Sequence, residues 1–267
     1  MMLRLLFLGD VVGRPGRRAV TIYLRRVLRG PGGARPDFVV ANAENASGGK
    51  GLDPAAAEEL QDAGIDVLTS GNHIWQNRAI IPYLADTTRV IRPANFAADV
   101  PGRGSTVCRV QRSEVAVGVL NLIGRVFMAP AECPFRKADV EIARIRSECR
   151  VVLVDMHAEA TSEKVAMGRY LDGRASVVIG SHTHIQTADD GILPGGTAYL
   201  TDAGMCGPED SVLGVRTDRV IERFVTQMPN RFDVATGPTL VQGALVDVDP
   251  ETGRAHRIER VRERVDA

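Results

Sequence analysis

The 267-residue chain has only four cysteines and no long apolar run. The cysteines are scattered, without Cys-x-x-Cys spacing, so they exclude a disulfide scaffold and predict reduced thiols in a cytoplasmic protein. No apolar segment approaches the roughly 20 residues that cross a bilayer, and Asp10 interrupts the first segment too early for a secretory signal. We therefore expect a cytoplasmic protein without a membrane partner.

The chain also lacks net charge, because 33 basic residues balance 33 acidic ones. This balance argues against a nucleic-acid partner that is bound by bulk electrostatics. A chain of this length buries enough surface to fold without disulfides, and no linker or repeat divides it. We expect one domain over residues 1–267.

Strands and helices alternate over the first two thirds of the chain. Apolar runs predict strands at 3–8, 38–41, 65–68, 151–154 and 176–179, and helical spacing predicts helices at 15–28, 54–64, 136–149 and 162–171. Residues 105–110 and 115–122 are typical of a hairpin. Later segments alternate like strands at 198–200, 221–226 and 240–248, with a turn at 249–253. This order predicts an α/β fold with two sheets and more β structure towards the end.

Polar side chains that suit metal binding follow these apolar runs. Taken alone, each has a plainer interpretation, such as a turn aspartate, a turn-capping asparagine or a pair of core histidines. Because open sheets place their chemistry at strand ends, their order along the chain predicts instead a two-metal phosphoesterase site. The residues are Asp10, Glu44, Asn45, Asn72, His73, His157, His182 and His184.

The pair His182 and His184 is the most specific element of this pattern. Along an extended segment the two imidazoles would share one face about 7 Å apart. That spacing suits two metals that stand roughly 3.5–4 Å from each other. The glycine-rich segment 47–51 does not fit a nucleotide P-loop, because no Ser or Thr follows Lys50. We expect it to be a loop that covers the site.

The order of these motifs resembles that of the calcineurin-like metallophosphoesterases. Within them, the strings GDVVGRPGR (9–17), NAENASGGKG (42–51), TSGNHIW (69–75), DMHAEATSEK (155–164), GSHTHIQTAD (180–189) and TDAGMCGPEDSVLG (201–214) are similar to the bacterial YmdB-type subfamily. The similarity runs from residue 3 to about residue 265. It implies an α/β (α+β) fold, namely a four-layer αββα sandwich of the metallo-dependent phosphatase type. It also implies a di-iron or similar centre that hydrolyses cyclic nucleotides, notably 2′,3′-cyclic ones, with a 3′-nucleotide as the product.

The resemblance also implies two ligand sets. The first metal would be held by Asp10, Glu44, Asn45 and His184, and the second by Glu44, Asn72, His157 and His182, with Glu44 bridging. The nucleophile would be a metal-bridging hydroxide, and His73 would donate a proton to the departing ribose oxygen.

This chain departs from the wider superfamily at three positions. Val12 replaces the histidine of an Asp-x-His motif, Glu44 replaces a bridging aspartate, and Ile74 replaces an acid after GNH. The orienting partner of His73 is therefore not given by the sequence. Oxygen and imidazole ligands without thiolate fit iron, manganese or zinc better than magnesium. The family resemblance implies two ions of iron, with manganese or zinc as alternatives.

Other functions stay open at this stage. The site would also suit 3′,5′-cyclic AMP or a broad-specificity phosphomonoesterase and phosphodiesterase, and a regulatory RNA-associated protein with a mainly structural metal site belongs to a different class. The expected partner is a small cyclic nucleotide or phosphodiester, and a homo-oligomer stays open. Trp75, Tyr83 and Phe127 are the candidate aromatic platforms for a base, and each fits a core position equally well.

Overall fold

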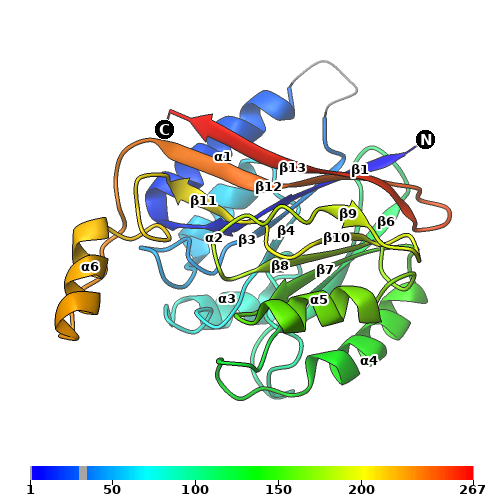
Figure 1. Cartoon of the computed structure of the whole chain (residues 1–267). Coiled ribbons are helices and arrows are strands. Elements are labelled where there is room, and N and C mark those ends of the chain that lie inside the picture. Colours follow the sequence, from blue (N-terminus) through cyan, green and yellow to red (C-terminus); the bar gives the residue numbers. More distant parts are fainter. Residues whose placement is uncertain (1, 30–34, 267) are drawn as a thin grey trace.

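The computed structural model describes residues 2–29 and 35–266, and it contains two β-sheets that stack between two layers of helices (Figure 1). The strands are β1 (Leu3–Leu8), β2 (Asp10–Val11), β3 (Phe38–Asn42), β4 (Val67–Thr69), β5 (Ser105–Arg109), β6 (Ala116–Ile123), β7 (Val151–His157), β8 (Val177–Ser181), β9 (Gly191–Ile192), β10 (Ala198–Leu200), β11 (Met205–Pro208), β12 (Thr239–Val248) and β13 (Ala255–Val265). The helices are α1 (Gly13–Val27), α2 (Pro54–Asp62), α3 (Ile80–Asp86), α4 (Pro134–Arg146), α5 (Thr161–Tyr170) and α6 (Thr217–Thr226).

The strand order brings the ends of the parallel strands to one edge of the sandwich. The first sheet has the order β2-β11-β12-β1-β3-β4, with β13 beside β12. The second has the order β5-β6-β7-β8-β10-β9. In the first sheet β1, β3 and β4 are parallel, and in the second β6, β7, β8 and β10 are parallel. Their carboxyl ends therefore carry the segments in which the sequence places the polar motifs.

Side-chain alternation along β1 explains the layers. Leu6 and Leu8 belong to an outer apolar cluster shared with α1 and α2, whereas Leu5 and Phe7 belong to the cluster between the two sheets. A third cluster joins β6, β7 and β8 to α4 and α5. This arrangement confirms the four-layer αββα sandwich. We propose that it forms one domain, because the inner cluster draws on both sheets.

Several local predictions are confirmed. Asp53 caps α2, where its side chain accepts a hydrogen bond from the Ala56 N–H at 2.9 Å, and Pro54 is the first helical residue. β5 and β6 form the predicted antiparallel hairpin. The structure also contains α3, a short helix that the sequence analysis did not predict.

The predicted strand at 221–226 is wrong, because these residues form the second half of α6. Their β-branched and aromatic side chains favour a strand by propensity. However, this segment projects from the sandwich as part of α6 and does not add a strand to either sheet (Figure 1). Only Val220 among its residues is buried, and Phe224 is 81% exposed.

The last strand closes one side of the first sheet. β13 pairs with β12 from Thr239 to Val248, and the predicted turn at 249–253 joins the two strands. Six of the eleven side chains along β13 are charged, and five of these six are exposed. Among residues 2–29 and 35–266, no helix combines the length and the apolar character that a bilayer-spanning segment requires.

Candidate metal centre

The structure brings all of the predicted site residues to one place beyond the strand ends. β1 is followed by Asp10, β3 by Glu44 and Asn45, β4 by Asn72 and His73, and β8 by His182 and His184, while His157 is the last residue of β7. Apart from the partly exposed histidines and Asn72, these side chains are buried.

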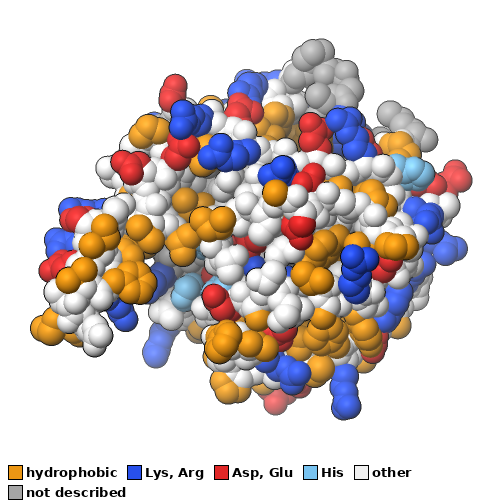
Figure 2. Space-filling view, in the orientation of Figure 1, with side chains coloured by type: hydrophobic (Ala, Val, Ile, Leu, Met, Phe, Trp, Pro, Cys, Tyr) orange, Lys and Arg blue, Asp and Glu red, His pale blue; other side chains and the backbone are white. Residues whose placement is uncertain are grey.

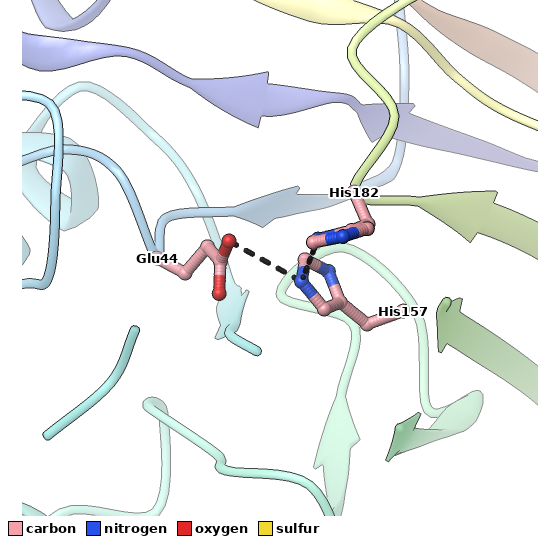
Figure 3. Close-up of side chains that lie close together, drawn as sticks. All are labelled: Glu44, His157 and His182. Carbon is pink, nitrogen blue, oxygen red and sulfur yellow. Dashed lines mark hydrogen bonds and ion pairs between the residues drawn. The ribbon is translucent and has the colours of Figure 1, made fainter. Parts of the chain in front are cut away.

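One group of side chains surrounds the imidazole of His157. Its Nε2 atom lies 3.2 Å from Glu44 Oε1, 3.1 Å from Asn72 Oδ1 and 3.1 Å from His182 Nδ1. Figure 3 shows Glu44 and His182 pointing towards this ring from separate segments. Ligand atoms of Glu44, His157 and His182 all lie within 4.8 Å of one another. This group matches the second predicted ligand set.

The first predicted set also borders Glu44. His184 Nε2 is 3.7 Å from Asp10 Oδ1 and 3.1 Å from Asn45 Nδ2. Asn45 Nδ2 also donates to Glu44 Oε1 at 3.3 Å. Glu44 therefore touches members of both sets, which is the position that a bridging ligand requires.

Burial sets the charge balance among these groups. Burial raises the pKa of Asp10 to about 6 and lowers that of His182 to about 3, where the charge of His157 adds to the effect. Burial alone would lower the pKa of His157, but the neighbouring carboxylate of Glu44 outweighs it and raises that pKa to about 9. The raised pKa of His157 means that its ring carries a proton beside Glu44, and a metal ion that binds this ring would displace the proton.

An unsatisfied oxygen tests whether the site fits a metal. Asp10 Oδ1 is buried and has no hydrogen-bond partner, while its Oδ2 accepts from the His182 N–H at 3.0 Å. A buried carboxylate oxygen without a partner is costly, and a cation would satisfy it. The predicted ligands of the centre are carboxylate, amide and imidazole groups without thiolate, a donor set that fits a pair of divalent metals.

A second layer of hydrogen bonds orients His157. Its Nδ1 lies 2.9 Å from Ser181 Oγ, which donates to Asp155 Oδ1 at 2.6 Å. Asn42 Nδ2 donates to the other oxygen of Asp155 at 3.0 Å. These contacts hold the ring with Nε2 facing the site. The DMH string contains Asp155, but sequence analysis gave it no role.

The backbone between the last two histidines differs from the prediction. β8 ends at Ser181, and His182 and His184 adopt φ angles of 94° and 62°, so they do not alternate along an extended strand. Such angles are strained for residues other than glycine. Both imidazoles still reach the site because the chain turns there.

Thr183 anchors this strained turn. Its N–H and its hydroxyl both donate to Asp202 Oδ2, at 3.2 and 2.6 Å, and Lys164 Nζ lies 2.6 Å from the same oxygen. The side chains of Lys164 and Asp202 are almost fully buried. Sequence reasoning missed this pair, although both residues lie inside the strings that carry the family resemblance.

The structure supplies a partner for His73. Its ring Nδ1 lies 3.3 Å from Glu44 Oε1, and its backbone N–H donates to Glu44 Oε2 at 3.1 Å. The side chain of His73 is 26% exposed, so the ring borders both the carboxylate and the solvent. Glu159, a further residue that sequence reasoning missed, lies 3.1 Å from His182 Nε2.

Gly71 makes room for the two groups at the centre. A Cβ atom at this position would lie 2.2 Å from His157 Nε2 and 2.3 Å from Glu44 Oε2. Neither atom can move away without disturbing the cluster. Glycine is therefore required at position 71.

The centre opens into a cavity of about 450 Å³. Figure 2 shows histidine atoms in the hollow between α6 and the sheets. The glycine-rich segment predicted to cover the site lines this cavity with Gly48, Gly49 and Lys50. Arg223 of α6 and segments on both sides of this helix also line the cavity.

Comparisons with known proteins agree with this geometry. The family described as "YmdB-like protein" matches residues 6–261. A Bacillus subtilis (strain 168) protein named 2′,3′-cyclic-nucleotide 2′-phosphodiesterase is 46% identical over 97% of this chain and 96% of its own length. A hypothetical protein from Thermus thermophilus has a TM-score of 0.90 at 38% identity, with 98% of this chain and 99% of that chain covered. A novel phosphatase from Mycoplasma pneumoniae has a TM-score of 0.91 at 32% identity, with 99% of this chain and 94% of that chain covered. The chain therefore belongs to the YmdB-like protein family, within the metallophosphoesterases that its sequence motifs resemble.

Proposed function

We propose that this chain is a metal-dependent phosphodiesterase that opens the 2′ ester of 2′,3′-cyclic nucleotides to give 3′-nucleotides. The observation that carries the proposal is the position of Glu44, whose carboxylate contacts members of both ligand sets. The name of the Bacillus subtilis relative, which is similar along nearly the whole chain, supports the substrate class.

Each protein group has a defined task in this proposal. Asp10, Asn45 and His184 would hold one metal, Asn72, His157 and His182 the other, and Glu44 both. Two bound divalent ions would supply a hydroxide nucleophile near neutral pH and neutralise charge on the phosphate. Iron is the metal that we propose first, with manganese and zinc as alternatives, and we propose a cytoplasmic location.

His73 would act on the leaving group. Hydrolysis breaks the bond between phosphorus and the ribose 2′ oxygen, so that oxygen needs a proton as it departs. The His73 ring borders the cavity and contacts Glu44, whose carboxylate holds the ring in place. We propose that His73 delivers this proton.

Two variants and one matched control test these roles. Purified wild type, Asp10→Asn and His73→Ala are compared with His256→Ala, which removes an exposed histidine from β13. Turnover of 2′,3′-cyclic AMP and bound metal are measured on the same samples. We expect Asp10→Asn to lose both metal and turnover. We expect His73→Ala to keep its metal while turnover falls about 10²- to 10⁴-fold.

Two outcomes would contradict the proposal. Full turnover by His73→Ala would remove its role as proton donor. A wild-type protein that binds two metals and hydrolyses aryl phosphates but no cyclic nucleotide would favour the broad-specificity phosphatase instead.

A further inference from the structure

The cavity beside the metal centre has an apolar part that the proposed chemistry does not use. Its lining includes Val12, Leu213, Val215, Phe232 and Val234 in addition to the polar residues of the centre. A volume of about 450 Å³ lies within the range of small-molecule sites. A substrate that consisted of phosphate and sugar alone would have no use for this surface.

The apolar part is built from two segments that flank α6. Val215 and Val234 form an antiparallel bridge, and the Arg216 N–H donates to Asp233 O at 3.0 Å. The first segment is tied to the metal centre, because His184 Nδ1 lies 3.0 Å from Leu213 O. The apolar surface is therefore continuous with the metal centre and fixed relative to it.

Phe232 and Arg223 form a stacked pair at this surface. The guanidinium carbon of Arg223 lies 5.3 Å from the centroid of the Phe232 ring, and both residues line the cavity. Unpaired bases stack on aromatic rings and on the guanidinium planes of arginine, and this pair provides one of each. The candidate platforms Trp75 and Tyr83 pack against the outer apolar cluster instead, and Phe127 is 91% exposed.

We propose that Phe232 and Arg223 form a nucleobase subsite, an inference that rests on the proposed function and extends it. In a 2′,3′-cyclic nucleotide the phosphate and the base are attached to different atoms of one ribose. When the phosphate is at the metal centre, the base must occupy a neighbouring, less polar surface. The pair and its apolar surroundings provide that surface.

The subsite recognises the flat face of a base more than its edge. Asn230 is the amide side chain that lines the cavity close to this pair in the sequence, and it donates to Arg219 O at 3.3 Å and to Glu222 Oε2 at 2.6 Å. These bonds hold Asn230 against α6. Stacking tolerates any base, since every base has a π face. We therefore expect kcat/KM values for 2′,3′-cyclic AMP and 2′,3′-cyclic UMP that agree within about tenfold.

The test compares Phe232→Ala with Phe224→Ala, which removes a phenylalanine that is 81% exposed on α6. Each variant is assayed with 2′,3′-cyclic AMP and with methyl riboside 2′,3′-cyclic phosphate, in which a methoxy group replaces the base. We expect Phe232→Ala to raise KM for cyclic AMP about tenfold relative to the base-free substrate. Phe224→Ala should behave like the wild type, and Phe232→Tyr should keep a KM close to that of the wild type.

A binding measurement keeps this inference separate from the proposed function. Adenosine binding, measured by saturation-transfer NMR, should be weaker for Phe232→Ala than for the wild type, whether or not either protein hydrolyses a cyclic nucleotide. Absence of wild-type turnover on both cyclic substrates would defeat the proposed function. The subsite would be overturned if Phe232→Ala and the wild type bound adenosine equally. It would also be overturned if a folded Phe232→Ala protein lost activity on cyclic AMP and on the base-free substrate to the same extent. If Phe232→Ala does not fold, Phe232→Leu provides the same comparison without a stacking ring.

Discussion

Removal of Lys164 should destabilise the protein through the carboxylate that it leaves behind. Lys164 Nζ is 2.6 Å from Asp202 Oδ2, and the two side chains are 1% and 0% exposed. In Lys164→Met the carboxylate of Asp202 would keep its bonds to Thr183 and to the Gly204 N–H, but it would have no counter-charge. Breaking a buried pair in this way costs roughly 3–5 kcal/mol. This is a large part of the free energy of unfolding of a typical domain, which is roughly 5–15 kcal/mol.

Urea unfolding measures the effect, and a double variant isolates the pair. Lys137→Met is the matched control, because Lys137 pairs at 3.3 Å with Glu132, a residue that is 55% exposed. We expect this control to lose at most about 1 kcal/mol. The double variant Lys164→Met/Asp202→Asn should cost less than the sum of the two single variants, because it leaves no unpaired charge.

The same variants report on the metal centre. Asp202 holds Thr183 between two proposed ligands, so its loss should relax the turn and weaken metal binding by about 10- to 100-fold. Calorimetric titration with a divalent metal measures this change. The reasoning is refuted if Lys164→Met unfolds at the same urea concentration as the wild type. It is also refuted if the losses in free energy of unfolding of the two single variants add up to the loss of the double variant.

Three further predictions concern glycine packing, metal removal and thiol reactivity. Gly71→Ala should lower metal affinity at least about tenfold, whereas Gly191→Ala, where a Cβ would have no neighbour closer than 4.0 Å, should leave it unchanged in the same titration. A chelator should lower the thermal midpoint, and added metal should restore it. At free metal 100 times its Kd, the bound metal would raise the free energy of unfolding by about 2.7 kcal/mol. An unchanged midpoint would argue against a metal bound to the folded state. Iodoacetamide should label Cys133 before Cys149, as followed by mass spectrometry. The N–H of Arg136 lowers the pKa of the Cys133 thiol, so its reactive thiolate forms at lower pH, whereas burial raises that of Cys149. Faster labelling of Cys149 would contradict this order.

The location of the centre could be predicted from the sequence because it depends on local order. Each of the proposed ligands follows an apolar run that is long enough to be recognised as a strand, and parallel strands bring their ends together. The structure brings these residues together as expected, and their role as ligands stays a prediction. The partner of His73 could not be predicted, because Glu44 lies on another strand end and reaches it only in the folded chain.

Two features were beyond pattern reasoning for physical reasons. The strand predicted at 221–226 was inferred from an alternating pattern, but these residues belong to α6, which leaves most of its apolar side chains exposed. Without a buried face, the helical period of this segment could not be recognised. The turn at His182 and His184 requires positive φ angles that histidine rarely adopts. It is supported by Lys164 and Asp202, which come from other parts of the chain.

The charged side chains of β13 affect how copies of the protein meet. An exposed edge strand presents unpaired N–H and C=O groups on which a second sheet can grow. β13 carries charge at most of its positions, namely Arg257, Glu259, Arg260, Arg262, Glu263 and Arg264. Charged side chains on an edge strand disfavour its pairing with a strand of another copy. This edge is therefore a poor template for continuing the sheet into a second copy.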